Sequence, residues 1–136
     1  MIFSWTEDLA TGVAEIDGQH KELFSRVNGL LEACNQKKGK EEIGRFLGFL
    51  EDYVIQHFTA EEKKMTELSY PGLSGHKAEH LEFTKKIVTI KKEFLEFGAE
   101  IHVVLMSVRA SGDWLVSHIK KTDKAMAEFL RSKGAR

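Results

Sequence analysis

Apolar residues recur at intervals of three and four along most of this chain, and this period constrains its fold more than any other feature. Such spacing places the side chains on one face of an α-helix, and that face must be buried against other elements. Proline, which interrupts helices, occurs only once in 136 residues. The chain is therefore predicted to be all-α. The clearest run comprises Leu23/Phe24, Val27, Leu30/Leu31 and Cys34.

Four helical segments are expected, separated by glycine or proline. The first should run from about residue 18 to residue 37, after Asp17 as its N-cap. The second ends before the break at 69–72, which contains the single proline. The third begins near Leu73 and ends at a corner marked by Gly98. The inner faces of the last three segments carry Ile43, Leu47, Leu50, Val54 and Met65; Phe83, Ile87, Ile90 and Phe94; and Ile101, Val104 or Leu105, Val108, Leu115, Ile119, Met126, Phe129 and Leu130.

Four amphipathic helices with short connections predict an antiparallel up-down four-helix bundle over residues 17–136. Residues 1–16 show no sustained period and are expected to form an extended N-terminal arm. The length fits a single domain, 1–136, with one continuous core. Within that core Cys34 should be buried, and Gly112 should permit a bend or a close contact.

Charge and composition exclude several classes of partner. Twenty basic and 21 acidic residues leave a net charge of -1, so neither nucleic acid nor a membrane surface is an expected partner. No apolar run approaches the roughly 18 residues that a membrane span requires. The first residues lack a signal-peptide pattern, and the single cysteine has no partner for an intramolecular disulfide, which favours a cytoplasmic location. A domain cut from a larger membrane receptor would show the same features.

Seven ionisable residues occupy the inner helix faces, where a bundle usually carries apolar side chains. Five imidazoles and two carboxylates share this interior with no inward lysine or arginine, and an uncompensated buried carboxylate is strongly unfavourable. Pairs four residues apart, such as His57/Glu61 and His76/His80, present two ligands from one helix to one centre. The set therefore predicts a metal cluster. Its members are His20, His57, Glu61, His76, His80, His118 and Asp123.

The spacing within this set is uneven. His118 and Asp123 are five residues apart, which turns them well over a quarter-turn out of line on an ideal helix and makes them the weakest pair. The sixth histidine, His102, has no companion at ligand spacing and is expected to lie at the surface or in ordinary packing. A lone buried histidine is more often a packed residue than a ligand, so the prediction depends on the whole set.

The number of ligands indicates two metals. Seven ligands are too many for one tetrahedral zinc, whereas two six-coordinate metals offer roughly twelve positions. Five imidazoles, two bridging carboxylates and one oxo or hydroxo bridge leave one position open for a small exogenous ligand. Mixed imidazole and carboxylate ligation suits iron in a helical bundle. With so few carboxylates, we expect such a centre to hold reduced oxygen rather than cleave it.

Together these motifs resemble the hemerythrin family, in particular the bacterial hemerythrins and hemerythrin-like domains, over nearly the whole chain. The entry into the first helix, GVAEIDGQHKELF at 12–24 followed by Asn28, is similar to that of the family. No ligand position of the family is missing. The other matching segments are HFTAEE at 57–62 with Met65, Tyr70-Pro71, His76 and His80 with Phe83, and Trp114-Leu115 before His118-Ile119 and Asp123.

The resemblance implies a non-haem di-iron centre with an oxo or hydroxo bridge. Dioxygen would bind reversibly, as hydroperoxide, at one open position on the iron that has two histidines. Trp114 and Leu115 would help to form an apolar lid over that position. In this assignment one iron is held by His76, His80 and His118, the other by His20 and His57, and the bridging carboxylates are Glu61 and Asp123.

Three functions remain open. Reversible oxygen binding for storage, delivery or sensing leads, because every inward acid or base is already a ligand and none is left for catalysis. The alternative is a di-iron enzyme or scavenger acting on peroxide or nitric oxide, of which a zinc or manganese hydrolase is a weaker form. The third is a redox- or oxygen-sensing module of a signalling protein, in which the ligand state shifts the arm or the C-terminal end.

Basic residues near the C-terminus form a candidate docking face for a protein partner or a parent signalling chain. Lysines at the end of a helix are also favoured by the helix dipole, and a solvated helix end is the preferred account of them. The residues are Lys120, Lys121, Lys124, Arg131, Lys133 and Arg136.

Overall fold

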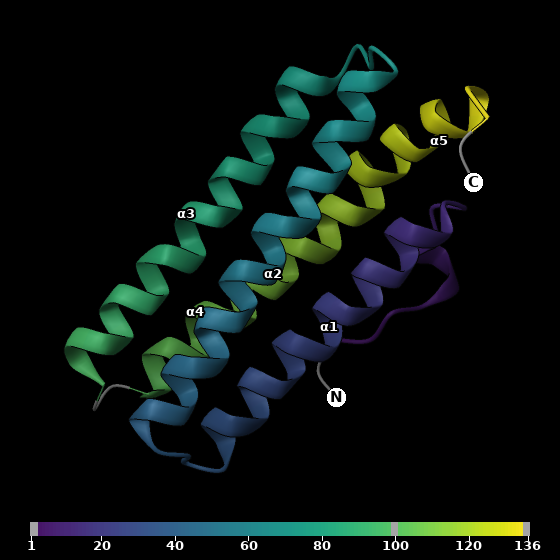
Figure 1. Cartoon of the computed structure of the whole chain (residues 1–136). Coiled ribbons are helices and arrows are strands. Elements are labelled where there is room, and N and C mark those ends of the chain that lie inside the picture. The colour runs from purple at the N-terminus through teal and green to yellow at the C-terminus, as the bar shows by residue number, and fades with distance from the viewer. Residues whose placement is uncertain (1–2, 99–100, 135–136) are drawn as a thin grey trace.

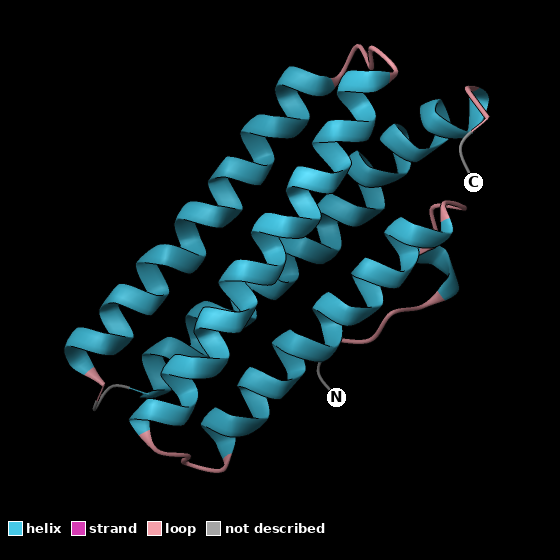
Figure 2. Cartoon of the chain, viewed as in Figure 1, coloured by secondary structure: helices cyan, strands magenta, loops and turns pink. Residues whose placement is uncertain are grey.

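The computed structural model describes residues 3–98 and 101–134, and all regular structure within them is helical (Figures 1 and 2). Each long segment packs against the next, and the last packs against the first, which closes the bundle. Chain direction alternates from one segment to the next (Figure 1). The antiparallel four-helix bundle is therefore confirmed. Its segments are α1 (Ala14–Asn35), α2 (Lys40–Glu67), α3 (Leu73–Phe97) and a final run of α4 (Ile101–His118), η2 (Ile119–Asp123) and α5 (Lys124–Ser132).

The predicted corners agree with the structure. The connection between α2 and α3 covers residues 68–72, where Ser69 adopts a φ of 54° and Pro71 follows. A positive φ of this kind ends the helical ladder, and proline cannot continue it. The third helix begins at Leu73 as expected, and Gly98 follows the last residue of α3.

The start of the first helix was predicted wrongly. The helix begins at Ala14 rather than near residue 18, and Val13 rather than Asp17 precedes its first turn. The Asp17 carboxylate instead accepts hydrogen bonds from the backbone N–H and the hydroxyl of Thr11, at 2.8 and 2.7 Å. These bonds fix the preceding turn, and burial of Val13 and Ile16 extends the apolar face by a full turn.

The N-terminal arm is therefore shorter than predicted and not extended throughout. It contains a short 3₁₀ turn, η1 (Glu7–Leu9), and its last residues belong to α1. At its start, the side chain of Asn28 accepts a hydrogen bond from the Phe3 N–H and donates one to the Phe3 carbonyl. A Cβ at Gly112 would lie 2.3 Å from the Phe3 ring, so this glycine permits the close contact that was one of its two predicted roles.

The interior contains two apolar clusters. The larger includes Leu23, Leu47 and Phe94, and the smaller includes Ile16, Met65 and Leu130. Cys34 is buried in the larger cluster and His102 is exposed, both as expected. The side chain of Ile101 and the whole of Arg136 lie outside the described residues.

No helix in the ranges 3–98 and 101–134 is both long enough and apolar enough to cross a membrane.

Candidate metal centre

The seven ionisable residues predicted from the sequence lie together in one buried layer. This layer lies between the two apolar clusters. The larger cluster packs against it on one side, toward one end of the bundle, and the smaller cluster packs against it on the other side. None is more than 3% exposed. The layer therefore contains two carboxylates and five imidazoles with apolar packing on both sides. Its members are His20 from α1, His57 and Glu61 from α2, His76 and His80 from α3, His118 from α4 and Asp123 from η2.

The layer divides into two groups that share their carboxylates. Within each group, the candidate ligand atoms lie within 4.8 Å of one another. We call the group with three histidines the first group and the group with two the second. The first contains His76, His80 and His118, the second contains His20 and His57, and Glu61 and Asp123 belong to both.

Each carboxylate turns one oxygen toward each group. Asp123 Oδ1 lies 2.8 Å from His76 Nε2 and 3.1 Å from His118 Nε2, whereas Asp123 Oδ2 lies 3.0 Å from His20 Nε2. Glu61 follows the same division, since Oε1 is 3.0 Å from His80 Nε2 and Oε2 is 3.4 Å from His57 Nε2. A carboxylate placed in this way can bridge two cations, one on each side.

The donor atoms are buried and have no hydrogen-bond partner in the part of the chain that the structure describes. This holds for Nε2 of all five histidines and for all four oxygens of Glu61 and Asp123. The imidazole and carboxylate atoms approach one another, but without the alignment of a hydrogen bond. Unpartnered polar atoms are rare and costly in protein interiors. Nitrogen and oxygen donors converging on two points fit a pair of cations in imidazole and carboxylate ligation.

Protonation in the metal-free chain follows from this crowding. At His20 and His76, burial alone would lower the pKa, but the two carboxylates outweigh it and raise the pKa to about 9. Burial dominates at His57, where it lowers the pKa to about 4. Burial would raise the pKa of Asp123, yet the surrounding histidines hold it well below its usual range. Without metal, the carboxylate charge is thus balanced in part by protons on histidine.

A π-helical segment brings His118 and Asp123 together. The prediction ranked this pair weakest because five residues do not return to the same face of an α-helix. Residues 119–123 form a π-helix instead, and the i to i+5 bonding of a π-turn accommodates one additional residue. The local widening places His118 Nε2 3.1 Å from Asp123 Oδ1.

Three further side chains, which sequence reasoning missed, contact the outer nitrogens of the histidines. His57 Nδ1 lies 2.6 Å from Gln19 Oε1, His80 Nδ1 lies 2.9 Å from Glu62 Oε2, and His118 Nδ1 lies 2.8 Å from Glu79 Oε1. Such contacts fix which nitrogen faces the metal and raise ligand basicity. Each partner is adjacent in sequence to a predicted ligand but supports a histidine on another helix. Their position next to a predicted ligand is the sequence signal that could have identified them.

Aromatic rings pack against the histidines of the first group. Trp114 stacks on His118 with ring centroids 4.8 Å apart, and Phe58 stacks on His80 at 3.8 Å. Leu115, the other residue predicted to cover the centre, is 1% exposed within the larger apolar cluster. These contacts limit the rotation of the histidine rings and exclude water from their faces.

Known proteins of similar sequence place the chain in one family. The family model described as "Hemerythrin HHE cation binding domain" matches residues 11–130. A bacteriohemerythrin of Methylococcus capsulatus is 36% identical over 130 residues, which cover 95% of this chain and 97% of that protein. Another, from Stenotrophomonas maltophilia, is 30% identical over 128 residues, covering 94% and 81%. The chain belongs to the hemerythrin family, as the resemblance of its motifs predicted.

A solved structure shows the same architecture. The crystal structure of a wild-type hemerythrin superposes with a TM-score of 0.87 and 36% sequence identity, covering 96% of this chain and 98% of that one. The similarity therefore extends over nearly the whole of both chains.

Proposed function

We propose that the chain binds two iron ions in the two groups and binds dioxygen reversibly at one of them. The observation that carries the proposal is the division of each carboxylate between the groups, with one oxygen toward each. In this assignment His76, His80 and His118 hold one iron, His20 and His57 hold the other, and Glu61 and Asp123 bridge them. The second group has one histidine fewer, so the open position is assigned there.

The bound iron pair supplies reversible two-electron chemistry toward dioxygen. The protein contributes a dry site, because the layer lies between two apolar clusters and its members are nearly inaccessible to solvent. Leu115 is assigned to the wall that keeps water from the open position. Trp114 stacks on His118 of the first group, so it is assigned to the wall beside that group instead. Exclusion of water slows proton entry and hence irreversible oxidation.

The test is rapid mixing of the anaerobic, ferrous-loaded chain with dissolved dioxygen, followed by visible absorption spectroscopy. A charge-transfer band should appear on mixing and disappear when oxygen is removed. His57→Ala should abolish the band, whereas the matched control His102→Ala should retain it because His102 is exposed and belongs to neither group. Direct conversion to the ferric form without a reversible band would overturn the proposal.

Oxygen sensing is a second candidate, favoured by one contact of the arm. Asp8 in η1 accepts a hydrogen bond from Lys124 Nζ through its carbonyl, at 2.7 Å, and pairs with Lys120 at 3.5 Å. Lys120 lies in η2, the segment that ends at Asp123. A shift of Asp123 would therefore be transmitted to the arm.

Hydrogen–deuterium exchange of peptides covering residues 3–11 tests this role. Sensing predicts a change in exchange when oxygen is added to the ferrous chain, and the same change should be lost in Lys120→Ala/Lys124→Ala. Identical exchange in the oxygenated and deoxygenated states would exclude the arm as the output.

A further inference from the structure

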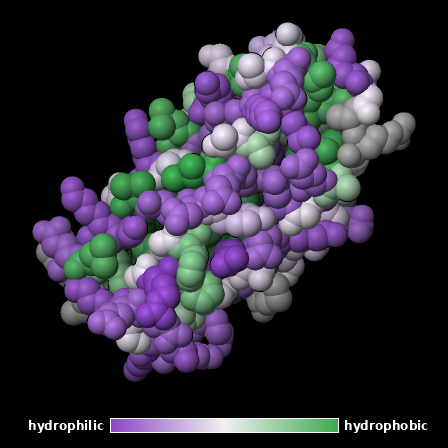
Figure 3. Space-filling model, in the orientation of Figure 1, coloured by the Kyte–Doolittle hydropathy of each residue, from purple (hydrophilic) through white to green (hydrophobic). Residues whose placement is uncertain are grey.

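The outer surface of α3 carries a row of large apolar side chains that a bundle does not need. Leu81, Val88 and Leu95 are 55%, 45% and 52% exposed and stand seven residues apart, so they lie on one face of the helix. Ile55 of α2, which is 42% exposed, lines the same side of the bundle. In Figure 3 hydrophobic groups follow the line of α3, with hydrophilic groups around them. We call these four residues the apolar row.

A groove between α2 and α3 connects the apolar row to the candidate metal centre. The groove encloses about 510 Å³ and is lined by Ile55 and Leu81 together with Phe58, Glu62 and His80. Two of these residues contact the histidine, since Phe58 stacks on its ring at 3.8 Å and Glu62 accepts from Nδ1 at 2.9 Å. On its other side, His80 Nε2 lies 3.0 Å from Glu61 Oε1. One imidazole therefore spans the distance between the surface groove and the centre.

Lysines flank the apolar row. Lys77 lines the groove, and Lys85 and Lys92 lie four residues after Leu81 and Val88, so they follow the row along the helix. All three are exposed, and none forms an ion pair with another residue in the described parts of the chain. An apolar strip bordered by unpaired positive charge is complementary to a partner with an apolar contact and acidic rim.

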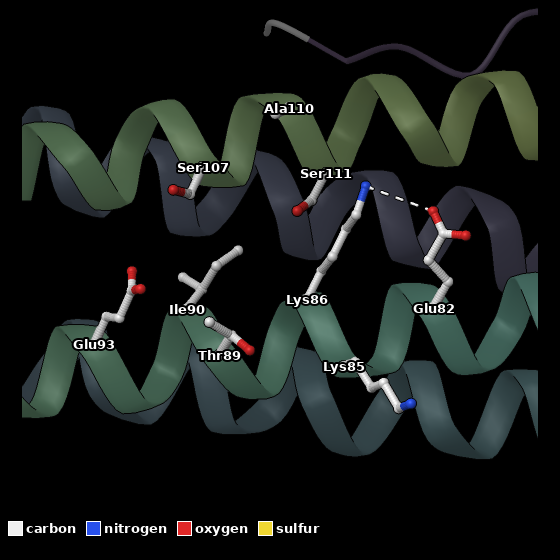
Figure 4. A pocket seen from close by; sticks show the side chains of 9 residues that line it. All are labelled: Glu82, Lys85, Lys86, Thr89, Ile90, Glu93, Ser107, Ala110 and Ser111. Atoms are coloured by element: carbon white, nitrogen blue, oxygen red, sulfur yellow. Dashed lines mark ion pairs between the residues drawn. The ribbon is translucent and has the colours of Figure 1, made fainter.

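The other side of α3 is different in character. A groove of about 520 Å³ lies between α3 and α4 (Figure 4). Its lining includes Ser107 and Ser111 of α4, Lys85, and the ion pair of Lys86 with Glu82 at 3.8 Å. None of the seven candidate ligands lines it. Of these two grooves, the one on the α2 side combines exposed apolar groups with a route to the centre.

We propose that the apolar row and its lysines form the docking surface for a small acidic electron-carrier protein that reduces the iron centre through His80. The inference rests on the proposed function, because a diferric centre needs a reductant to regain its oxygen-binding state. Two donor molecules would each lose one electron and two ferric ions would become ferrous, so the electrons balance; an oxo bridge would in addition take up one proton from solvent. Contacts for electron transfer are small and transient, which suits a short row of this kind.

Neither a second copy of the chain nor a lipid surface fits as well. Packing α3 on α3 of another copy would bring lysines against lysines, whether the helices ran parallel or antiparallel, and like charges brought together are unfavourable. Glu51 and Asp52 of α2 lie on the same side of the bundle as the row and would repel the uniform negative charge of an anionic membrane. A small protein can instead place its acidic groups against the lysines alone.

The test measures reduction of the diferric, iron-loaded chain by reduced plant-type [2Fe–2S] ferredoxin under anaerobic stopped flow. Lys85→Glu/Lys92→Glu should slow reduction by about tenfold at low ionic strength, because electrostatic steering is reversed. Val88→Asp should slow it as well. The control Lys38→Glu/Arg109→Glu makes the same change in net charge at positions that line neither groove and should leave the rate unchanged.

Two further measurements separate the possible results. Dithionite should reduce all variants at the same rate, and oxidised ferredoxin should protect peptides covering residues 81–95 from hydrogen exchange. Equal ferredoxin rates in all variants, protection of another face, or dimerisation or vesicle binding through the row would overturn the docking proposal. If instead the chain fails to take up iron, or dithionite yields no oxygen-binding state, the proposed function fails.

Discussion

The two histidine groups share both carboxylates but differ in what supports their histidines. In the first group, His80 and His118 each contact a carboxylate through Nδ1, from Glu62 and Glu79. In the second group His57 contacts the neutral amide of Gln19. The remaining histidine of each group, His76 in the first and His20 in the second, has no hydrogen-bond partner at Nδ1 among the described residues. The bridging ligands are thus common to both groups, whereas the outer charge is concentrated on one.

This comparison shows that histidine ligands of the same kind can differ in basicity, because different side chains contact their outer nitrogens. A carboxylate behind an imidazole raises its basicity and fixes its orientation, so the first group should hold its metal more tightly. Thr122 strengthens that arrangement by donating to Glu79 at 2.9 Å. The second group, with fewer histidines and less negative charge around it, is the less saturated site, as expected of the position that takes an exogenous ligand.

Loss of a shared carboxylate should have the largest effect on metal content, because the carboxylate is a ligand in both groups. Asp123→Asn should reduce metal content from about two ions per chain to below about one, since each oxygen of Asp123 faces a different group. Asp113→Asn, an exposed position on α4, is the control. Metal analysis after gel filtration measures the content. Retention of both ions in Asp123→Asn would show that the carboxylate does not bridge.

Loss of one histidine should affect one group only. His118→Ala and His57→Ala should each leave about one tightly held ion per chain, in the second and first group respectively. Metal analysis combined with crystallography identifies the surviving site. If either variant lost both ions, the groups would be one cooperative unit and the distinction between them would not hold.

Substitution of the side chains that contact the outer nitrogens of the histidines should have a smaller effect on metal binding. Glu79→Gln should weaken metal binding in the first group by about 10- to 100-fold, the usual effect of losing such a partner. Gln19→Ala removes only a neutral contact, so we expect a smaller loss, confined to the second group. Competition with a chromophoric chelator gives both values. Equal losses in the two variants would mean that charge behind the imidazole does not matter here.

The unaltered chain should release protons when it binds metal, and this is the smallest of the expected effects. His20 and His76 have pKa values near 9 in the metal-free chain, so both are protonated at pH 7 and must lose their protons to bind metal. His57, with a pKa of about 4, is already neutral. Burial would lower the pKa of His118, but Asp123 raises it above its usual range. Binding should therefore release at least about two protons per chain at pH 7, and progressively fewer as the pH rises through 9. Calorimetry in buffers of different ionisation enthalpy measures this release, and a value independent of pH would contradict it.

Sequence periodicity was sufficient to predict the bundle, its corners and the layer of seven residues, because burial of a helix face requires a fixed spacing. It failed where local structure departs from the ideal helix. The π-helix after His118 realigns Asp123, and the Thr11 contact with Asp17 moves the start of α1 to Ala14. Neither departure has a periodic signature, since both depend on contacts that form only in the folded chain.

The outer partners could not be assigned from spacing for a related reason. Gln19, Glu62 and Glu79 each support a histidine on a different helix, 18 to 39 residues away along the chain. Adjacency to a ligand marks them as candidates, but which histidine they reach depends on how the helices are rotated against one another. Packing of the whole bundle decides that rotation.

Anomalous diffraction at the iron edge from crystals of the iron-loaded chain tests the central claim most directly. We predict two iron peaks, one among His76, His80 and His118 and one beside His20 and His57, with Glu61 and Asp123 contacting both. A single peak, or two peaks that do not share these carboxylates, would contradict the account.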